Sequence, residues 1–87
     1  MTKRMMNTPK TVEEAIALEG TLWQSENDVR EIANVESATI SQYDKRTVLA
    51  DVYWRKKRKD GSFGPVRKTP TPMTTFRTWL NKAVKIG

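Results

Sequence analysis

Five consecutive cations, Arg55-Lys56-Lys57-Arg58-Lys59, are the residues of this 87-residue chain whose types and spacing best suit a chemical role. Guanidinium and ammonium groups hold phosphates through charge-assisted hydrogen bonds, and each neutralised phosphate of a nucleic acid releases condensed counterions. Arg67 and Lys68 follow after an Asp60-Gly61 turn signal. Cations packed so closely repel one another unless an anion is bound, so the run predicts a phosphate-binding surface.

The distribution of charge along the chain favours the same kind of partner. The net charge is +6, yet residues 11–36 carry −6, residues 55–68 carry +6, and the segments 1–10 and 69–87 carry +3 each. Such asymmetry is typical of proteins that meet a polyanion such as nucleic acid. A purely structural explanation stays open, because Lys and Pro at the edge of a sheet also prevent edge-to-edge aggregation.

The composition argues against an enzyme. The chain has no Cys and no His, which excludes disulfides and thiolate zinc sites and removes the usual acid–base group near neutral pH. No nucleophile–base pair, phosphate loop or metal-ligand spacing is present, so we expect no catalytic residues, no cofactor and no metal. An apolar stretch of about 18 residues, long enough for a membrane span, is missing, and no signal peptide is recognisable. We therefore expect a cytoplasmic protein with no membrane partner.

The chain length predicts a single small α+β domain at residues 11–87, preceded by a flexible basic arm at residues 1–10. Thr11-Val12-Glu13-Glu14 matches a capping box at the start of a helix, and Gly20 ends or bends that helix. Ser25 is expected to cap a second short helix from about Glu26 to Ala33.

The second half of the chain predicts a sheet and a closing helix. β-Branched and aromatic residues alternate over residues 47–54, which is typical of a strand, and a turn at 59–62 lets residues 63–68 return on an edge that tolerates Pro65. We therefore expect an antiparallel β-hairpin or three-stranded sheet at about 47–68, with the basic run at its tip. A C-terminal amphipathic helix is expected at about 72–85, capped by Thr71, with an apolar stripe of Met73, Phe76, Trp79, Leu80, Ala83 and Val84.

Residues 26–44 contain a local resemblance to a known family. Asp28-Val29-Arg30-Glu31-Ile32-Ala33-Asn34-Val35-Glu36-Ser37-Ala38-Thr39-Ile40-Ser41-Gln42-Tyr43 resembles the helix-turn-helix of repressor-type DNA-binding proteins. The matching positions are Val29 and Ala33 on the first helix, Asn34 and Val35 at the turn, and Ile40 and Tyr43 on the second helix. The resemblance implies that Ser37, Thr39, Ser41 and Gln42 face the major groove and read base edges.

This resemblance has one departure and one competitor. Arg30 stands where the family usually has Ala or Gly, at a point where the two helices press together. The competing interpretation places residues 37–43 on a strand, because Thr39, Ile40 and Tyr43 suit either state.

Two α+β architectures therefore fit the pattern. In the first, three helices precede a basic hairpin and a closing helix, which is similar to a winged-helix domain. In the second, an N-terminal helical region packs with a three-stranded antiparallel sheet and the C-terminal helix, similar to small DNA-binding domains of plant regulators and phage integrases. Both arrangements place residues 53–68 at the working surface.

The leading functional prediction is a non-enzymatic nucleic-acid-binding protein, a small regulator or accessory factor whose basic hairpin contacts double-stranded DNA. The residues expected to hold phosphates are Arg55, Lys56, Lys57, Arg58, Lys59, Arg67 and Lys68, with Arg77 and Lys82 contributing from the last helix. Tyr53 and Phe63 flank the run, and they are expected either to stack on bases or, as is commoner, to belong to the core. Whether the nucleic acid is DNA or RNA stays open.

The competing prediction is a protein-binding module. It would be a small phage-type inhibitor or adaptor whose basic hairpin docks on an acidic surface of a host protein. The acidic segment 11–36 could instead meet the basic hairpin of a second copy, giving a homodimer or a head-to-tail oligomer.

Overall fold

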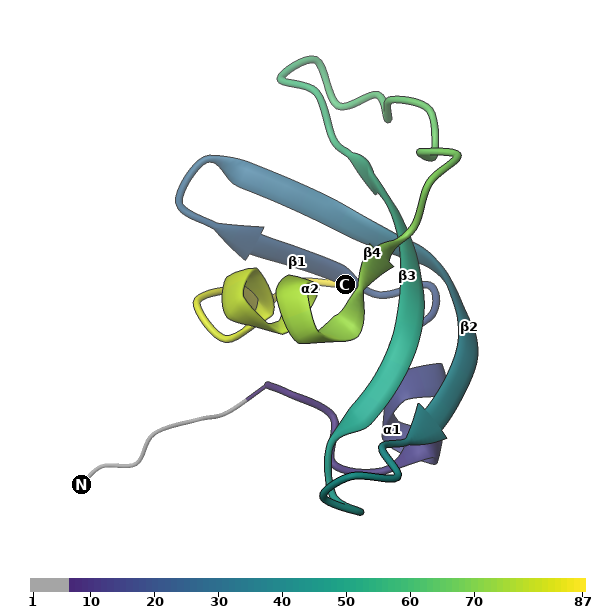
Figure 1. Ribbon diagram of the computed structural model, residues 1–87. Coiled ribbons are helices and arrows are strands. Elements are labelled where there is room, and N and C mark those ends of the chain that lie inside the picture. Colours follow the sequence, from purple (N-terminus) through teal and green to yellow (C-terminus); the bar gives the residue numbers. More distant parts are fainter. Residues whose placement is uncertain (1–6) are drawn as a thin grey trace, which may run out of the picture.

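The computed structural model describes residues 7–87, which form a five-stranded antiparallel sheet and two short helices (Figure 1). The elements in chain order are α1 (Val12–Ile16), β1 (Leu22–Ser25), β2 (Asp28–Ile40), β3 (Val48–Lys56), β4 (Thr71–Pro72), α2 (Met73–Leu80) and β5 (Val84–Lys85). The strand order is β4-β3-β2-β1-β5, so four consecutive strands form a meander and the last strand returns to pair with β1. The predicted α+β class is confirmed.

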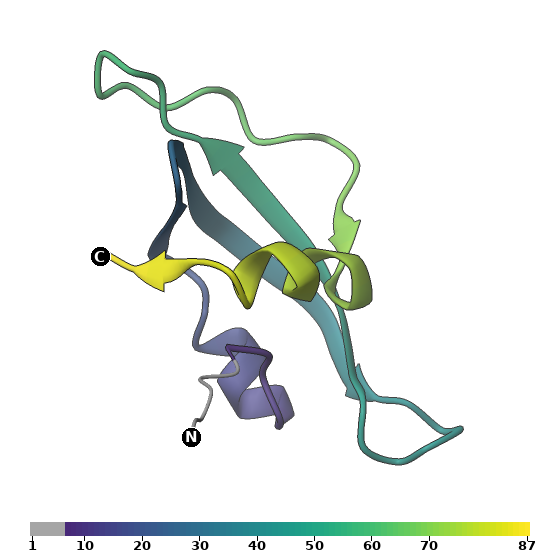
Figure 2. The ribbon, with the colours of Figure 1, turned by 90° about the vertical axis from the view of Figure 1, so that its left-hand side faces the viewer.

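The β2–β3 ladder curves around α2, as Figures 1 and 2 show. Its register shifts twice, between Ile32 and Asn34 and between Glu36 and Thr39. An extra residue in one strand bends that strand and increases its twist, and Ser37, within the second shift, has a left-handed φ of 57°. The bent ladder therefore has a concave face toward α2 and an outer face on the other side.

The core lies between this concave face and the helices. α2 contributes Met73, Phe76 and Leu80, which join Ile32 and Val52 of the sheet in one buried cluster, each at most 1% exposed. Burying a side chain of this size contributes about 1.5–3 kcal/mol. The apolar stripe of the last helix is thus the main contact that closes the fold.

Two apolar patterns predicted from the sequence are confirmed, each with a limit. Val48 and Ala50 of β3 are buried like Val52, whereas the intervening Leu49 is 38% exposed on the outer face. The stripe of the last helix points inward as far as Leu80, and Ala83, which lies beyond the end of the helix, is also buried. Val84 is 66% exposed because the helix has already ended and this residue belongs to β5.

Arg30 is held on the concave face by two indole rings. Its guanidinium carbon lies 4.0 Å from the centre of the Trp54 ring and 4.4 Å from that of the Trp79 ring. Its Nη2 forms an ion pair with Asp28 at 2.9 Å. A cation over an aromatic face contributes about 0.5–2 kcal/mol, more as it is desolvated. Arg30 therefore links the β2–β3 ladder to α2.

The helices predicted at 26–33 and for a helix-turn-helix over 26–44 are not formed, because Asp28–Ile40 is one strand. The first register shift explains the error. It lets Val35, three residues after Ile32, share the buried side of the sheet, and this spacing imitates a helix. The strand interpretation of residues 37–43 is correct for residues 37–40, and residues 41–47 form the β2–β3 turn. The winged-helix arrangement is therefore wrong.

Of the hairpin predicted at 47–68, only the first strand is formed. Residues 63–68 make a single bridge, from Phe63 to Lys57, and no strand. Pro65 lacks a backbone N–H and cannot donate to a ladder. The connection from β3 to β4 is therefore the long β3–β4 loop, residues 57–70, in place of the expected return strand.

The C-terminal helix is shorter than the predicted 72–85, since α2 spans Met73–Leu80. Pro72 occupies its N-cap position without a side-chain hydrogen bond. Thr71, the predicted cap, instead accepts a hydrogen bond from Nε1 of Trp54 at 3.0 Å. Neither helix in residues 7–87 has the length and apolar character needed to cross a membrane.

The capping box at the first helix is confirmed in a modified form. Oγ1 of Thr11 accepts a hydrogen bond from the backbone N–H of Glu14 at 3.0 Å, whereas the Glu14 carboxylate accepts from the N–H of Lys10 at 2.8 Å. α1 ends at Ile16, and a turn leads to Gly20, whose φ of 82° favours glycine.

Residues 7–10 of the predicted arm lie against the end of α2. Asn7 donates from Nδ2 to the carbonyl oxygens of Leu80 and Ala83, at 2.9 Å each, and its N–H donates to Oδ1 of Asn81 at 2.8 Å. The last carbonyls of a helix lack partners within the helix, so Asn7 satisfies the end of α2. Pro9 is buried. The rest of the predicted arm, including Lys3 and Arg4, lies outside the described residues.

Asp44 holds the β2–β3 turn in shape. Its Oδ1 accepts hydrogen bonds from the backbone N–H groups of Arg46 and Thr47 at 3.0 Å each, and its Oδ2 accepts from the Thr47 hydroxyl. These bonds, with that of the Thr47 hydroxyl first, lower the pKa of Asp44 from 3.8 to about 2. The carboxylate therefore stays ionised except at strongly acidic pH.

Replacing Ile32 by Ala should lower the free energy of unfolding by about 2–5 kcal/mol, because the removed carbons leave a cavity in the core. The matched control is Leu49→Ala on the outer face, for which we expect a loss below about 1 kcal/mol. Urea denaturation of the parent and both variants measures these values. Equal losses would contradict the assignment of the concave face as the core.

Asp44→Asn should make stability less sensitive to acid. The pKa of Asp44 is about 2 in the folded protein and 3.8 in a free side chain, so between these values only the unfolded chain binds the proton. The stabilising contribution is complete above about pH 4 and is lost as the pH falls toward 2. Thermal unfolding from pH 5 to pH 2 should show a steeper loss for the parent than for D44N, and identical slopes would rule out this role.

Candidate nucleic-acid interface

The β3–β4 loop extends away from the sheet and helices (Figures 1 and 2). Its tip is an ordered turn. The N–H of Arg58 donates to the carbonyl of Ser62 at 2.6 Å, and the N–H of Gly61, which has a φ of 93°, donates to the carbonyl of Arg58 at 3.0 Å. Oδ1 of Asp60 accepts from the N–H and the hydroxyl of Ser62, and these bonds lower the pKa of Asp60. The loop therefore presents its side chains on a defined backbone.

Most cations of the predicted interface are exposed on this loop or at its base. Lys57 is half-buried, and the exposed cations are Lys56, Arg58, Lys59, Arg67 and Lys68. Only two ion pairs form within residues 7–87, Arg30–Asp28 and Arg55–Glu31. None of the exposed cations of the loop therefore has a carboxylate partner in the described part of the chain. Asp60, the one carboxylate among residues 57–70, is engaged by Ser62.

Arg55 differs from the other residues of the basic run. Its Nε lies 2.5 Å from Oε1 of Glu31, and its guanidinium carbon lies 4.3 Å from the centre of the Phe63 ring. Arg55 thus fastens the returning arm of the loop to the sheet. A base could stack on this face of Phe63 only if Arg55 moved, so both residues have a structural role that the sequence did not reveal.

The two arms of the loop meet at its base. The N–H of Gly64 donates to the carbonyl of Lys56 at 2.8 Å, and the Arg67 guanidinium lies 5.1 Å from the centre of the Trp54 ring. A hollow of about 140 Å³ lies there, lined by Trp54, Arg55, Lys56, Gly64, Pro65 and Arg67. The base of the loop therefore combines cations from both arms around one indole ring. β3 ends at Lys56, so the last three residues of the basic run lie in the loop.

The residues predicted to read bases lie far from the loop. Ser37 and Thr39 are exposed on β2, and Gln42 is exposed in the β2–β3 turn, at the other end of the ladder (Figure 1). Ser41 is only 8% exposed, and its Oγ accepts a hydrogen bond from the N–H of Tyr43 at 3.2 Å. The structure thus does not bring the predicted base-reading and phosphate-holding residues together.

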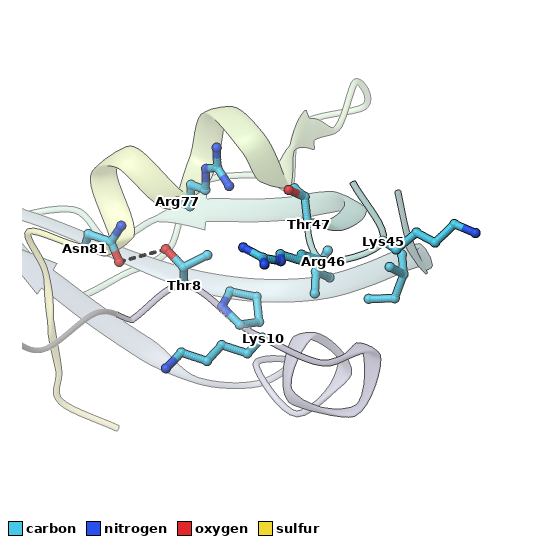
Figure 3. A pocket seen from close by; sticks show the side chains of 10 residues that line it. Thr8, Lys10, Lys45, Arg46, Thr47, Arg77 and Asn81 are labelled. Carbon is cyan, nitrogen blue, oxygen red and sulfur yellow. Dashed lines mark hydrogen bonds between the residues drawn. The ribbon is translucent and has the colours of Figure 1, made fainter. Parts of the chain in front are cut away.

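Arg77 and Lys82 also lie outside the loop. Lys82 is exposed just after α2, and Arg77 is half-buried on α2. Arg77 lines a separate cavity of about 760 Å³ with three cations that the sequence did not single out, Lys10, Lys45 and Arg46 (Figure 3). The segment 37–54 is neutral because Asp44 and Asp51 cancel Lys45 and Arg46, and a charge count by segment therefore hides this pair.

Acidic side chains gather elsewhere on the sheet. Asp28 and Glu31, of the acidic segment 11–36, form the two ion pairs within the domain. Glu36 lies opposite Asp51 in the ladder, a like-charge pair that Nδ2 of Asn34 relieves with a hydrogen bond to Glu36 at 2.6 Å. Part of the acidic segment is therefore neutralised inside one molecule, which leaves less of it for the basic loop of a second copy.

Comparison with known proteins finds no relative of this chain. No family model matches the chain, and no curated protein and no solved structure matches it either. The function is therefore inferred from the charges, contacts and exposure of residues 7–87 alone.

Proposed function

We propose that the protein is a non-enzymatic nucleic-acid-binding protein that holds the phosphates of double-stranded DNA with its β3–β4 loop, as a small regulator or accessory factor. The observation that carries this proposal is the set of exposed loop cations without a carboxylate partner among the described residues. Lys56, Arg58, Lys59, Arg67 and Lys68 supply the contacts.

The energetic basis is the difference between the free and the bound loop. In the free protein, these cations repel one another and no carboxylate among the described residues pairs with them, although Arg58 donates hydrogen bonds to Ser62 and Phe63 and Arg67 lies near the Trp54 ring. On DNA, each phosphate that they neutralise releases condensed counterions. The logarithm of the binding constant therefore falls linearly with the logarithm of the salt concentration, with a slope of about 0.9 per phosphate contact. A loop that extends from the body suits this task, because it can follow a backbone or enter a groove without a clash from the sheet.

The proposed binding depends on the backbone of the nucleic acid more than on its sequence. A helix that enters the major groove is the usual carrier of base-specific contacts, and the segment that resembled one is β2. Gln42, to which base readout was attributed, lies in a turn at the far end of the ladder from the loop. We therefore expect weak preference among duplex sequences, and no change of preference in Gln42→Ala.

Replacing Lys56 and Lys59 together by Gln should weaken the binding of a short duplex with 5′-hydroxyl ends by roughly tenfold or more at 0.15 M salt. The slope of the logarithm of the binding constant against the logarithm of the salt concentration should become shallower by about 2, because two phosphate contacts are lost. Both side chains are exposed, so the fold should be unaffected. Fluorescence anisotropy across a salt series measures both quantities.

The matched control removes the same charge from the other end of the ladder, with Lys45 and Arg46 replaced by Gln. This control should retain the affinity and the salt slope of the parent for that duplex. If both variants lost affinity equally, binding would depend on net charge alone and the assignment to the loop would fail. If the parent bound no DNA or RNA, the acidic protein partner would become the better hypothesis.

A further inference from the structure

A second cationic surface lies at the opposite end of the molecule from the β3–β4 loop. Three segments that are distant in sequence form most of the wall of the cavity of about 760 Å³, namely residues 8–10, residues 45–48 of the turn region, and α2 with the residue after it, and Ile40 of β2 completes the lining (Figure 3). Lys10, Lys45, Arg46 and Arg77 line this cavity, and no Asp or Glu is among its lining residues.

The walls of this cavity are fixed by hydrogen bonds. Oγ1 of Thr8 donates to Oδ1 of Asn81 at 3.0 Å, and Asn7 ties the same segment to the end of α2. On the other side, the N–H of Lys45 donates to the carbonyl of Ser41 at 2.9 Å and the N–H of Ser41 donates to the carbonyl of Thr47 at 2.8 Å. The cavity is therefore built by the fold, since every wall is anchored to α2 or to the β2–β3 ladder.

Two arginines, Arg46 and Arg77, line the same cavity. Figure 3 shows Arg46 extending from the turn toward Thr8, whereas Lys45 points away, and Arg77 lies on the α2 wall of the cavity. Neither arginine forms an ion pair within residues 7–87. Arg77 is half-buried on α2. Guanidinium forks match the oxygens of phosphate in a bidentate way, which makes this pair an anion-binding arrangement.

Two carboxylates that are hydrogen-bonded to lining residues do not neutralise it. Both oxygens of Asp44 are occupied by the N–H groups of Arg46 and Thr47 and by the Thr47 hydroxyl. Oε1 of Glu14 accepts from the backbone N–H of Lys10. These two carboxylates lower the local positive charge but leave the four lining cations in excess.

We propose that this cavity binds a phosphate group that carries two negative charges, held between Arg46 and Arg77 with Lys10 at the rim. The concave shape distinguishes it from the loop. An extended loop meets the singly charged phosphates along a backbone, whereas a recess lined by two arginines suits an end group with several free oxygens. Free pyrophosphate and the 5′-phosphate at the end of a nucleic-acid strand share this chemistry. The site is independent of the function proposed for the loop.

The primary test is calorimetric titration of the full chain with inorganic pyrophosphate. We expect saturable binding by the parent, at least tenfold weaker binding by the Lys45→Gln/Arg46→Gln variant, and unchanged binding by the Lys56→Gln/Lys59→Gln variant. Lys45 and Arg46 are exposed, so thermal unfolding should confirm that the first variant is folded. Arg77→Lys is the second variant of the site. It keeps the charge but not the fork, and should weaken binding several-fold.

A second titration identifies the source of the phosphate. One short single strand is compared with and without a 5′-phosphate. A gain from that phosphate in the parent and none in the Lys45→Gln/Arg46→Gln variant would assign the site to strand ends, whereas pyrophosphate binding without such a gain would assign it to a free anion.

The inference is overturned if the parent fails to bind pyrophosphate at millimolar concentration, or if both double variants weaken its binding equally. These outcomes are separate from those of the loop. A failure of duplex binding in the parent would leave the pyrophosphate titration intact, and a failure of the titration would leave duplex binding by the loop intact.

Discussion

The bend of β2 is the constraint on which the rest of the structure depends. The thirteen-residue strand pairs with β1 at one end and with β3 along most of its length, and two extra residues within the part paired with β3 bend it. Without the bend, the sheet would offer no concave face for Phe76 and Leu80. A chain of this size buries only about 60% of its unfolded surface or slightly more, so a short helix enclosed by a curved sheet is an economical way to build a core.

The bent β2–β3 ladder also divides the cations of the domain into two groups, those on the ladder and those on the connections. Arg30 and Arg55, near the start of β2 and the end of β3, are used by the fold, one between two indole rings and one between Glu31 and Phe63. The cations on the connections form no ion pair among the described residues, although Arg58 and Arg67 make contacts within the loop and with Trp54. Because these cations lie outside the sheet, they are available to an external anion. The basic run divides into two groups at Lys56 for the same reason, since the strand ends there and the loop begins.

Local chemistry was readable in the sequence wherever one residue determines its own neighbourhood. The cap at Thr11, the alternation of Val48 and Ala50, and the inward stripe ending at Leu80 follow from propensity and period alone. Helices were predicted where β2 lies because a bulge changes the spacing between buried residues from two to three for one step. No residue type marks that step in the sequence. The cavity at Arg46 and Arg77 could not be predicted, since it exists only after tertiary folding brings three distant segments together.

The hydrogen-bonded ladder between β2 and β3 also has a mechanical meaning. β3 runs nine residues from the turn to the base of the loop, and at about 3.3 Å per residue this separates its two ends by roughly 25–30 Å. Because β3 is paired with β2 along its length, the strand is stiff, and the distance between its two ends is fixed, unlike that between the ends of a flexible linker. A single molecule that touched both ends would have to be at least this long, close to one helical repeat of duplex DNA, and shorter ligands can occupy only one end at a time.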